Sequence, residues 1–157
     1  MELIDGVQVK PLKPIPDERG LLMELLRSDE PMFERFGQIY VTICKPRIVK
    51  GWHYHKLQTD HFVCLQGKAK VVLYDGREKS KTKGKINEFI IGWHNPLMVK
   101  IPTYVYHGFT AADDKEAMIL NIPTEVYRYK DPDEYRASPF TNEIPYDWGN
   151  VDRALSR

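Results

Sequence analysis

The sequence has little cysteine, almost no net charge and no long apolar run. Cys44 and Cys64 are its only cysteines, too few for a secreted scaffold held by disulfides, and both lie in apolar runs. We expect buried free thiols in a reducing cytosol, with a disulfide or a catalytic thiol as the alternative. The 23 basic and 22 acidic side chains leave a net charge of +1, which argues against a general nucleic-acid surface.

Membrane and export signals are also lacking. No run approaches the roughly 18 apolar residues of a spanning helix. The N-terminal residues show no apolar segment behind a basic start, so no secretory signal is visible. We therefore expect a cytoplasmic protein that binds neither membranes nor nucleic acid.

The length and the turn-forming residues favour one strand-rich domain. A chain of 157 residues is too short for a nucleotide-binding domain plus a separate substrate domain, so we expect a single domain over 1–157. The chain has 11 prolines and 10 glycines beside nine tyrosines, six phenylalanines and three tryptophans. Many breakers among many aromatics favour short strands and turns over long helices.

Alternating and β-branched runs indicate where the strands lie. They predict strands over 38–44, 87–92, 96–102 and 116–123, and two strands within 61–77 around a Gln66-Gly67 turn. The spacing is typical of a sandwich or barrel. Two short helices are predicted, one over 29–37 that ends at Gly37 and one within 131–140.

The sharpest local signal is a group of histidines. His53 and His55 are two residues apart, so on a strand both imidazoles point to the same face. Asp60 and His61 follow after a turn, and His107 belongs to a later strand. Imidazoles that converge with a carboxylate suit Fe(II), Mn(II), Ni(II) or Zn(II). The alternative is histidines held by hydrogen bonds on the surface or in the core, which is our expectation for the fifth histidine, His94.

This spacing is similar to the metal-binding motifs of the cupin superfamily. The pattern is H-x-H, then an acid at Asp60 and a glycine at Gly67, followed by a distant Pro102 and His107. Cupins usually carry glutamate at the acid position and a glycine between the later proline and histidine. The resemblance implies an all-β cupin fold, a double-stranded β-helix or jelly-roll barrel.

Over about 17–148 the sequence resembles the dTDP-4-dehydrorhamnose 3,5-epimerase family. The matching motifs, in order, are DERG at 17–20, KGWHYH at 50–55, DGREKSKTKG at 75–84 and NPLMVKIPTYVYHGF at 95–109. These are cupin-fold enzymes that act on nucleotide-linked 4-keto sugars. Family proteins are somewhat longer, so the resemblance implies a shortened and divergent member.

The resemblance implies roles for five residues. His53 matches the family's catalytic base, which removes a proton next to the keto group, and His107 matches a second active-site histidine. Arg19 matches an arginine that reaches the nucleotide phosphates, often across a dimer interface. Gln38 matches a polar residue near the substrate, and Asp152 corresponds to the aspartate that orients the base.

Four departures from the family pattern bear on the chemistry. The family's acid is a tyrosine, and the matching position here is Asn121, which cannot deliver a proton. Asp60 stands where the family has lysine, Lys50 where it has arginine and His55 where it has glutamine. Tyrosines that could replace the missing acid are Tyr40, Tyr104, Tyr106, Tyr127 and Tyr129.

Three functions follow as hypotheses. The leading one is a cofactor-free epimerase or isomerase of a dTDP-4-keto-6-deoxyhexose-like substrate, with His53 as base and with His107 and His55 stabilising an enolate. Its expected substrate-binding residues are Arg19, Gln38, Lys50, Tyr54 and Asn121. The second is a metal-dependent isomerase or oxygenase that uses a divalent transition metal held by His53, His55, Asp60 or His61, and His107. The third is a non-catalytic carbohydrate-binding protein, suggested by Asn121 and by the aromatics Trp52, Tyr54, Tyr104 and Tyr106.

A homodimer is also expected. In the resembling family the early segment adds a strand to the neighbouring subunit, and this hides a sheet edge. We therefore expect residues of about 1–37 to contribute to a dimer interface.

Overall fold

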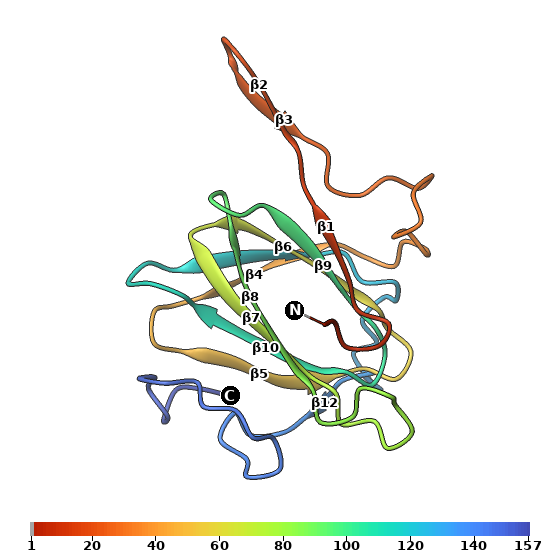
Figure 1. Ribbon diagram of the computed structural model, residues 1–157, viewed down its shortest axis with the longest axis vertical. Helices are drawn as coiled ribbons and strands as arrows, with labels where there is room; N and C mark the ends of the chain where they lie inside the picture. The colour runs from red at the N-terminus through yellow and green to blue at the C-terminus, as the bar shows by residue number, and fades with distance from the viewer. Residues whose placement is uncertain (1) are drawn as a thin grey trace.

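A computed structural model describes residues 2–157 and consists of two five-stranded antiparallel sheets and a separate hairpin (Figure 1). The first sheet has the order β1-β9-β6-β11-β4, the second has the order β12-β5-β10-β7-β8, and β2 pairs with β3. The strands are β1 Gln8–Pro11, β2 Pro14–Asp17, β3 Gly20–Met23, β4 Tyr40–Cys44, β5 Val49–Tyr54, β6 Asp60–Gln66, β7 Lys68–Tyr74, β8 Ile86–Gly92, β9 Leu97–Ile101, β10 Tyr106–Ala111, β11 Ala117–Asn121 and β12 Tyr135–Arg136.

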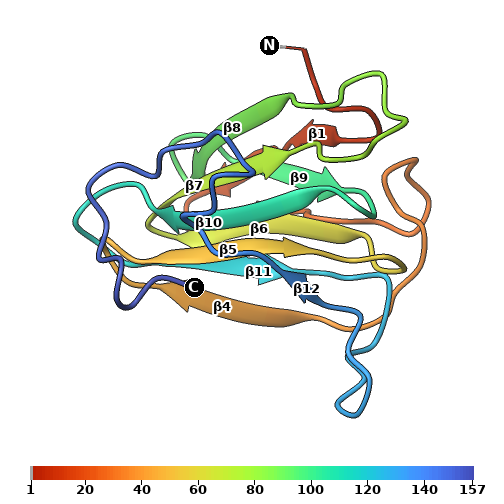
Figure 2. The same ribbon diagram turned by 90° about the horizontal axis from the view of Figure 1, so that it is seen from below.

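The two sheets face each other and enclose the main core (Figure 2). Side chains along β7 alternate between the two faces of its sheet. Ala69, Val71 and Leu73 point into this core, whereas Val72 points to the outer face. Side chains of both sheets fill the space between them, as expected for a jelly roll in which inward and outward positions alternate.

Segments without regular structure cover the outer faces of both sheets. Met32 packs with Val63, Met98 and Leu120 against the outside of the first sheet. The C-terminal residues Ile144 and Trp148 pack with Val49, Trp52 and Val72 against the second sheet. Each sheet therefore buries apolar side chains on two faces, which explains why several of its strands read as continuous apolar runs.

The predicted strands are confirmed and the two predicted helices are wrong. Residues 2–157 contain no helix, so none that is long and apolar enough to cross a membrane. Glu30 accepts from the amide of Arg27 and pairs with Lys10, and Met32 is buried in the outer core, so contacts with the sheet fix 29–37 as turns and loop. Within 131–140 the segment Tyr135–Arg136 instead pairs with β5 as β12.

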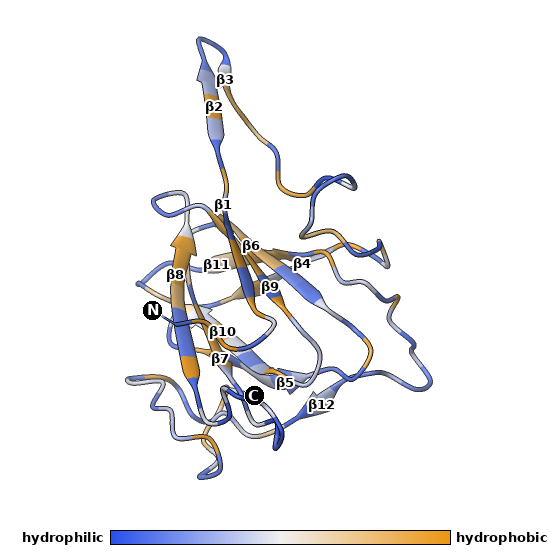
Figure 3. Cartoon of the chain, turned by 45° about the vertical axis from the view of Figure 1, so that its right-hand side comes forward, coloured by the Kyte–Doolittle hydropathy of each residue, from blue (hydrophilic) through white to orange (hydrophobic). Residues whose placement is uncertain are grey.

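The β2–β3 hairpin extends away from the two sheets (Figures 1 and 3). Three of its apolar side chains remain in solvent, with Ile15 49% exposed, Leu21 47% and Leu22 59%, whereas Met23 at its base packs against the outer core. A two-stranded hairpin on its own is marginally stable in water. The fold therefore contains an arm whose outer apolar side chains are exposed in the described part of this chain.

Strands β5 and β10 approach each other closely at a pair of glycines. A Cβ atom added at Gly51 would lie 2.6 Å from the Cα of Gly108, so side chains cannot be accommodated there without moving backbone. The two strands pair with His107 opposite His53, and a register shift follows His107. This close contact brings the two histidines together.

A buried carboxylate organises the connection between β7 and β8. Asp75, fully buried, accepts from the Arg77 guanidinium at 2.8 Å and from the hydroxyls of Ser80 and Thr82, each at 2.6 Å. The pKa of Asp75 is lowered, because these hydrogen bonds outweigh the effect of burial, which acts in the opposite direction. The polar residues of 75–84 therefore hold this turn together.

Replacement of Asp75 by alanine is expected to lower the free energy of unfolding by about 3 kcal/mol, because Arg77 and two hydroxyls lose their shared acceptor. Urea denaturation measures the loss. The control is Glu78→Ala, in the same segment, whose side chain is 82% exposed, and this change should cost less than about 0.5 kcal/mol. Equal losses in the two variants would contradict the role assigned to Asp75.

Candidate active site

A cavity of about 830 Å³ opens between the two sheets, beside the edge strand β4 of the first sheet and β5 of the second. One wall comes from β4 of the first sheet and the other from β5 and β10 of the second. The segment 125–136, which leads to β12, closes the rim. Residues that line the cavity include Gln38, Tyr40, Thr42, Lys50, His53, His55, Gln58, Phe62, His107, Tyr127, Arg128, Tyr129, Glu134, Arg136 and Arg157.

Three of the histidines predicted from the sequence meet in this cavity. His53 lies on β5 and His55 follows the strand by two residues, so both face inward as expected. His107 enters from β10, and its ring centre lies 6.1 Å from that of His53 and 5.4 Å from that of His55. The spacing of the sequence motif and the pairing of β5 with β10 together produce this cluster.

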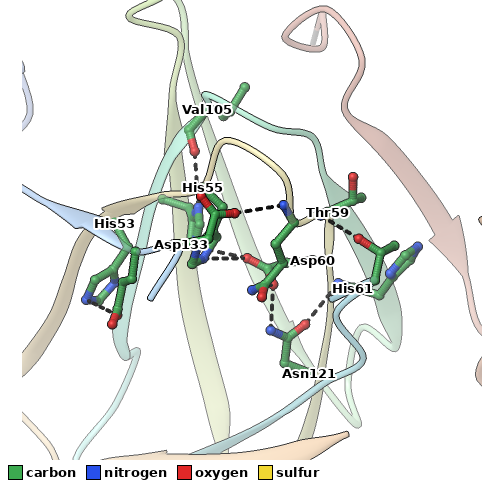
Figure 4. Close-up of polar contacts among 12 residues, drawn as sticks. His53, His55, Thr59, Asp60, His61, Val105, Asn121 and Asp133 are labelled. Atoms are coloured by element: carbon green, nitrogen blue, oxygen red, sulfur yellow. Dashed lines mark hydrogen bonds and ion pairs between the residues drawn. The ribbon is translucent and has the colours of Figure 1, made fainter. Parts of the chain in front are cut away.

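Asp60 lies at the centre of the polar contacts (Figure 4). Its carboxylate is buried, and Oδ2 is 3.3 Å from the Nε2 atoms of both His55 and His107. Its other oxygen accepts from the side-chain amides of Gln58 at 2.6 Å and of Asn121 at 2.7 Å. The carboxylate therefore connects residues of both sheets, with all of its neighbours oriented toward it.

The backbone fixes the orientation of the two imidazoles beside Asp60. The Nδ1 atom of His107 lies 3.1 Å from the carbonyl oxygen of Val105, and Nδ1 of His55 contacts the carbonyl oxygen of Asp133. A carbonyl oxygen only accepts, so the Nδ1 atoms carry the hydrogens and the Nε2 atoms face Asp60. Asp133 is itself held, because its carboxylate accepts from the backbone amides of 56–58.

The histidines have different charge states. Burial lowers the pKa of His55, but the hydrogen bond and the charge of Asp60 outweigh burial and raise this pKa to about 9. Burial and the nearby cationic groups, His107 first among them, lower the pKa of His53 to about 3. Burial also lowers the pKa of His107. Near neutral pH the cavity thus holds a neutral His53 and a charged His55.

Glu134 lies beside His53, with its Oε1 atom 3.7 Å from Nε2 of the imidazole, and it also pairs with Arg136 at 3.0 Å. The family resemblance implies that Asp152 is the carboxylate that orients the base. Asp152 instead caps the C-terminal turn by accepting from the amide of Ala154 at 3.0 Å, and it is not among the residues that line the cavity. Glu134 was missed because only the pairing of β12 with β5 brings it to the site.

Asn121 occupies the position at which the resembling family has tyrosine. Its side-chain amide donates to Asp60 and, at 2.9 Å, to the hydroxyl oxygen of Tyr40, which is its cross-strand partner on β4. The carbonyl oxygen of the same side chain accepts from the amide of His61 at 3.0 Å. Tyr40 therefore reaches the site through a neighbouring strand.

The predicted substrate-binding residues do not all lie in the cavity. Gln38 and Lys50 line the cavity, where Lys50 donates to Thr42 at 2.9 Å. Tyr54 is not a lining residue and stacks on Tyr135 with ring centres 5.0 Å apart. Arg19 lies at the turn of the β2–β3 arm, 82% exposed and paired with Asp17, away from the cavity of its own chain.

Part of the predicted metal-ligand set is brought together. Ligand atoms of His55, Asp60 and His107 all lie within 4.8 Å of one another. Two imidazoles and a carboxylate, with both Nδ1 atoms held by backbone carbonyls, fit the donor set of a divalent transition metal. His61 does not belong to the set, because its two ring nitrogens face the carbonyl oxygens of Ile122 and Met32, at 2.9 and 3.1 Å.

In the variant Asp60→Asn the pKa of His55 is expected to fall from about 9 to below the ordinary histidine value of about 6.5, because burial remains and the carboxylate is gone. NMR titration of histidine-labelled protein measures this change. The control is Asp114→Asn, at an exposed position, which should leave the titration unchanged. An unaltered His55 titration in Asp60→Asn would show that another group holds the charge.

Comparison with known proteins places this site in a family. The family model described as polysaccharide biosynthesis C-terminal domain matches residues 15–135. A probable low-salt glycan biosynthesis epimerase of Haloferax volcanii is 41% identical over 94% of this chain and 91% of its own. A spore coat polysaccharide biosynthesis protein of Bacillus subtilis is 39% identical over 96% of this chain and 100% of its own.

Solved structures share the fold. A dTDP sugar isomerase of Desulfovibrio desulfuricans G20 superposes with a TM-score of 0.87 at 37% identity, over 96% of each chain. A dTDP-6-deoxy-D-glucose-3,5-epimerase of Legionella pneumophila superposes with a TM-score of 0.86 at 22% identity, over 99% of this chain and 85% of that one. The chain therefore belongs to the polysaccharide biosynthesis C-terminal domain family, as a short member with the jelly-roll fold of the dTDP-sugar 3,5-epimerases.

Proposed function

We propose that this protein is an epimerase or isomerase of a nucleotide-linked 4-keto sugar, most simply a dTDP-4-keto-6-deoxyhexose. The observation that carries the proposal is geometric: His53, His55 and His107 meet in one cavity, with the Asp60 carboxylate 3.3 Å from Nε2 of His55. The names of the relatives support the substrate class, because they include a glycan biosynthesis epimerase and a dTDP sugar isomerase.

The chemistry begins with removal of a proton from the carbon next to the keto group. A neutral imidazole with a free nitrogen is a suitable base, and His53 has this form near neutral pH. The electron pair moves to the keto oxygen, where the positive charge of His55 stabilises the enolate, and His107 stands beside it. Glu134, next to His53, stabilises the imidazolium that forms.

The cationic side chains of the cavity suit the diphosphate of a nucleotide. Lys50, Arg128, Arg136 and Arg157 all line it, and guanidinium groups bind phosphate oxygens through paired hydrogen bonds. Gln38 accepts from the amide of Tyr127 at 3.0 Å, which fixes the rim where the nucleotide would enter. A few placed cations are enough for an anionic ligand, so the net charge near zero is no obstacle.

We propose that no metal takes part, because Oδ1 of Asp60 accepts from the amides of Gln58 and Asn121, and Oδ2 pairs with the charged His55. The second candidate function is a metal-dependent isomerase or oxygenase, which the donor set of His55, Asp60 and His107 favours. Metal analysis of protein purified without a histidine tag distinguishes the two. A stoichiometric transition metal that is lost in His55→Ala would establish the second function.

We also propose a homodimer in which the β2–β3 arm packs on a second copy of the chain. Its exposed Ile15, Leu21 and Leu22 would be covered there, and Arg19 at its turn would be carried toward the partner subunit. A cytoplasmic location remains part of the proposal, and it is supported by the free, buried state of Cys44 and Cys64.

The catalytic role of His53 predicts solvent exchange at the sugar. In D₂O the wild-type protein should introduce deuterium next to the keto group of a dTDP-4-keto-6-deoxyhexose, and His53→Asn should slow this by about 10²–10⁴-fold. Mass spectrometry measures the label, and Asp114→Asn, exposed and outside the cavity, is the control. If several nucleotide sugars show no exchange above His53→Asn, the enzymatic function is wrong and a binding protein remains.

The arm predicts the oligomeric state. Light scattering at micromolar concentration should give twice the chain mass of 18.4 kDa, and the double variant Ile15→Asp, Leu22→Asp should give the single mass. Leu57→Asp is the matched control, because Leu57 is equally exposed at 55% but lies off the arm. A wild-type mass of 18.4 kDa would overturn the dimer.

A further inference from the structure

The hydroxyl of Tyr40 lies on the opposite wall of the cavity from His53. Tyr40 begins β4, an edge strand of the first sheet, whereas His53 is on β5 of the second sheet, and both side chains line the same cavity. A sugar ring placed between the two sheets would therefore present one face to His53 and the other to Tyr40. Epimerisation by proton transfer needs such an arrangement, because the proton leaves one face and returns to the other.

The contacts of Tyr40 leave its proton free. Asn121 donates to its oxygen at 2.9 Å, so this oxygen acts as an acceptor. The side-chain amide of Asn121 cannot be flipped by 180°, because its oxygen accepts from the backbone amide of His61 and its nitrogen also donates to Asp60. Within residues 2–157 no acceptor receives a hydrogen bond from the Tyr40 hydroxyl. Its hydrogen is thus available to a ligand.

The surroundings of Tyr40 keep the phenol protonated until a strong base appears. Tyr40 is 40% exposed as a whole, and the desolvation of its hydroxyl and the negative charges of Asp60 and Glu134 raise its pKa to about 12, although the hydrogen bond from Asn121 acts in the opposite direction. A phenol in this state holds its proton near neutral pH and can give it to a carbanion, which is more basic. The same charges then favour rapid return of a proton to the phenolate.

The other tyrosines considered from the sequence are placed less well. Tyr104 and Tyr106 lie in an aromatic group around Tyr54 and are not lining residues of the cavity. Tyr127 and Tyr129 line the rim and pack on each other with ring centres 5.2 Å apart, and Tyr129 is 90% exposed. Tyr40 is the one of the five whose oxygen is held by the Asp60 network.

We propose that Tyr40 is the catalytic acid that returns a proton to the sugar, on the face opposite His53, and that Asn121 is a positioning residue which holds its hydroxyl. This inference rests on the proposed epimerase function.

His53 takes a proton from the carbon next to the keto group, and the C–H electron pair forms the enolate. The O–H bond of Tyr40 then breaks, a new C–H bond forms on the opposite face, and the electron pair restores the C=O bond. Water reprotonates the phenolate and removes the proton from His53.

The test separates proton removal from inversion. In D₂O, with a dTDP-4-keto-6-deoxyhexose as substrate, Tyr40→Phe should retain deuterium incorporation within about 10-fold, because His53 still exchanges its proton with solvent and returns a deuteron to the same face. Formation of the inverted sugar should fall by about 10²–10⁴-fold. Mass spectrometry measures the deuterium, and NMR coupling constants measure the inversion. Tyr104→Phe, which makes the same change at a tyrosine that does not line the cavity, should leave both rates unchanged.

Each other outcome is informative. Wild-type inversion by Tyr40→Phe would overturn the assignment, and so would an equal loss of exchange and inversion in a folded variant, because Tyr40 would then act before reprotonation. Absence of exchange in the wild-type protein would instead contradict the epimerase function itself. Asn121→Leu should raise the ratio of exchange to inversion in the same direction as Tyr40→Phe, a change that a general loss of stability would not produce.

Discussion

The buried carboxylate of Asp60 is the contact on which the site depends. It sits at the first residue of β6 and receives His55, His107, Gln58 and Asn121. An ionised carboxylate is costly to bury unless it is paired and hydrogen-bonded, and the charged His55 and the two side-chain amides supply that compensation. Because the partners come from both sheets, the carboxylate also fixes how the two sheets meet beneath the cavity.

This arrangement lets two chemically identical side chains have different roles. His55 is hydrogen-bonded to the Asp60 carboxylate and holds a proton. His53 is buried near positively charged groups and remains neutral. Pairs of titratable groups whose surroundings drive their pKa values apart are typical of acid–base sites. The opposite wall adds Tyr40, whose hydroxyl is connected to the same carboxylate through Asn121. One buried charge thus influences groups on both walls of the cavity.

Much of the fold could be predicted because strands have a period of two. The alternation along β7 and the turn at Gly67, where φ is +71°, are legible in the sequence. The helices predicted over 29–37 and within 131–140 failed because contacts distant in sequence decide these segments. Lys10 binds Glu30, and β5 pairs with Tyr135. Neither contact can be predicted from the local periodicity of the sequence.

In the site, too, local motifs could be predicted, whereas contacts between residues distant in sequence could not. The H-x-H spacing identified His53 and His55, and the later motif identified His107, which the structure brings to one cavity. Glu134 has no motif, since only the edge pairing of β12 brings it to His53. The motif comparison shows that Asn121 replaces the family tyrosine. Its contact with Tyr40 could not be predicted, because that contact depends on the register of β11 with β4.

A structure with a bound, non-reacting analogue tests this account most directly. The analogue is a dTDP-linked 6-deoxyhexose that lacks the keto group. The account predicts that the sugar lies between the sheets, with one ring carbon within about 3.5 Å of His53 on one face and of the Tyr40 hydroxyl on the other. A sugar bound outside the cavity, or one that meets both side chains on the same face, would contradict it.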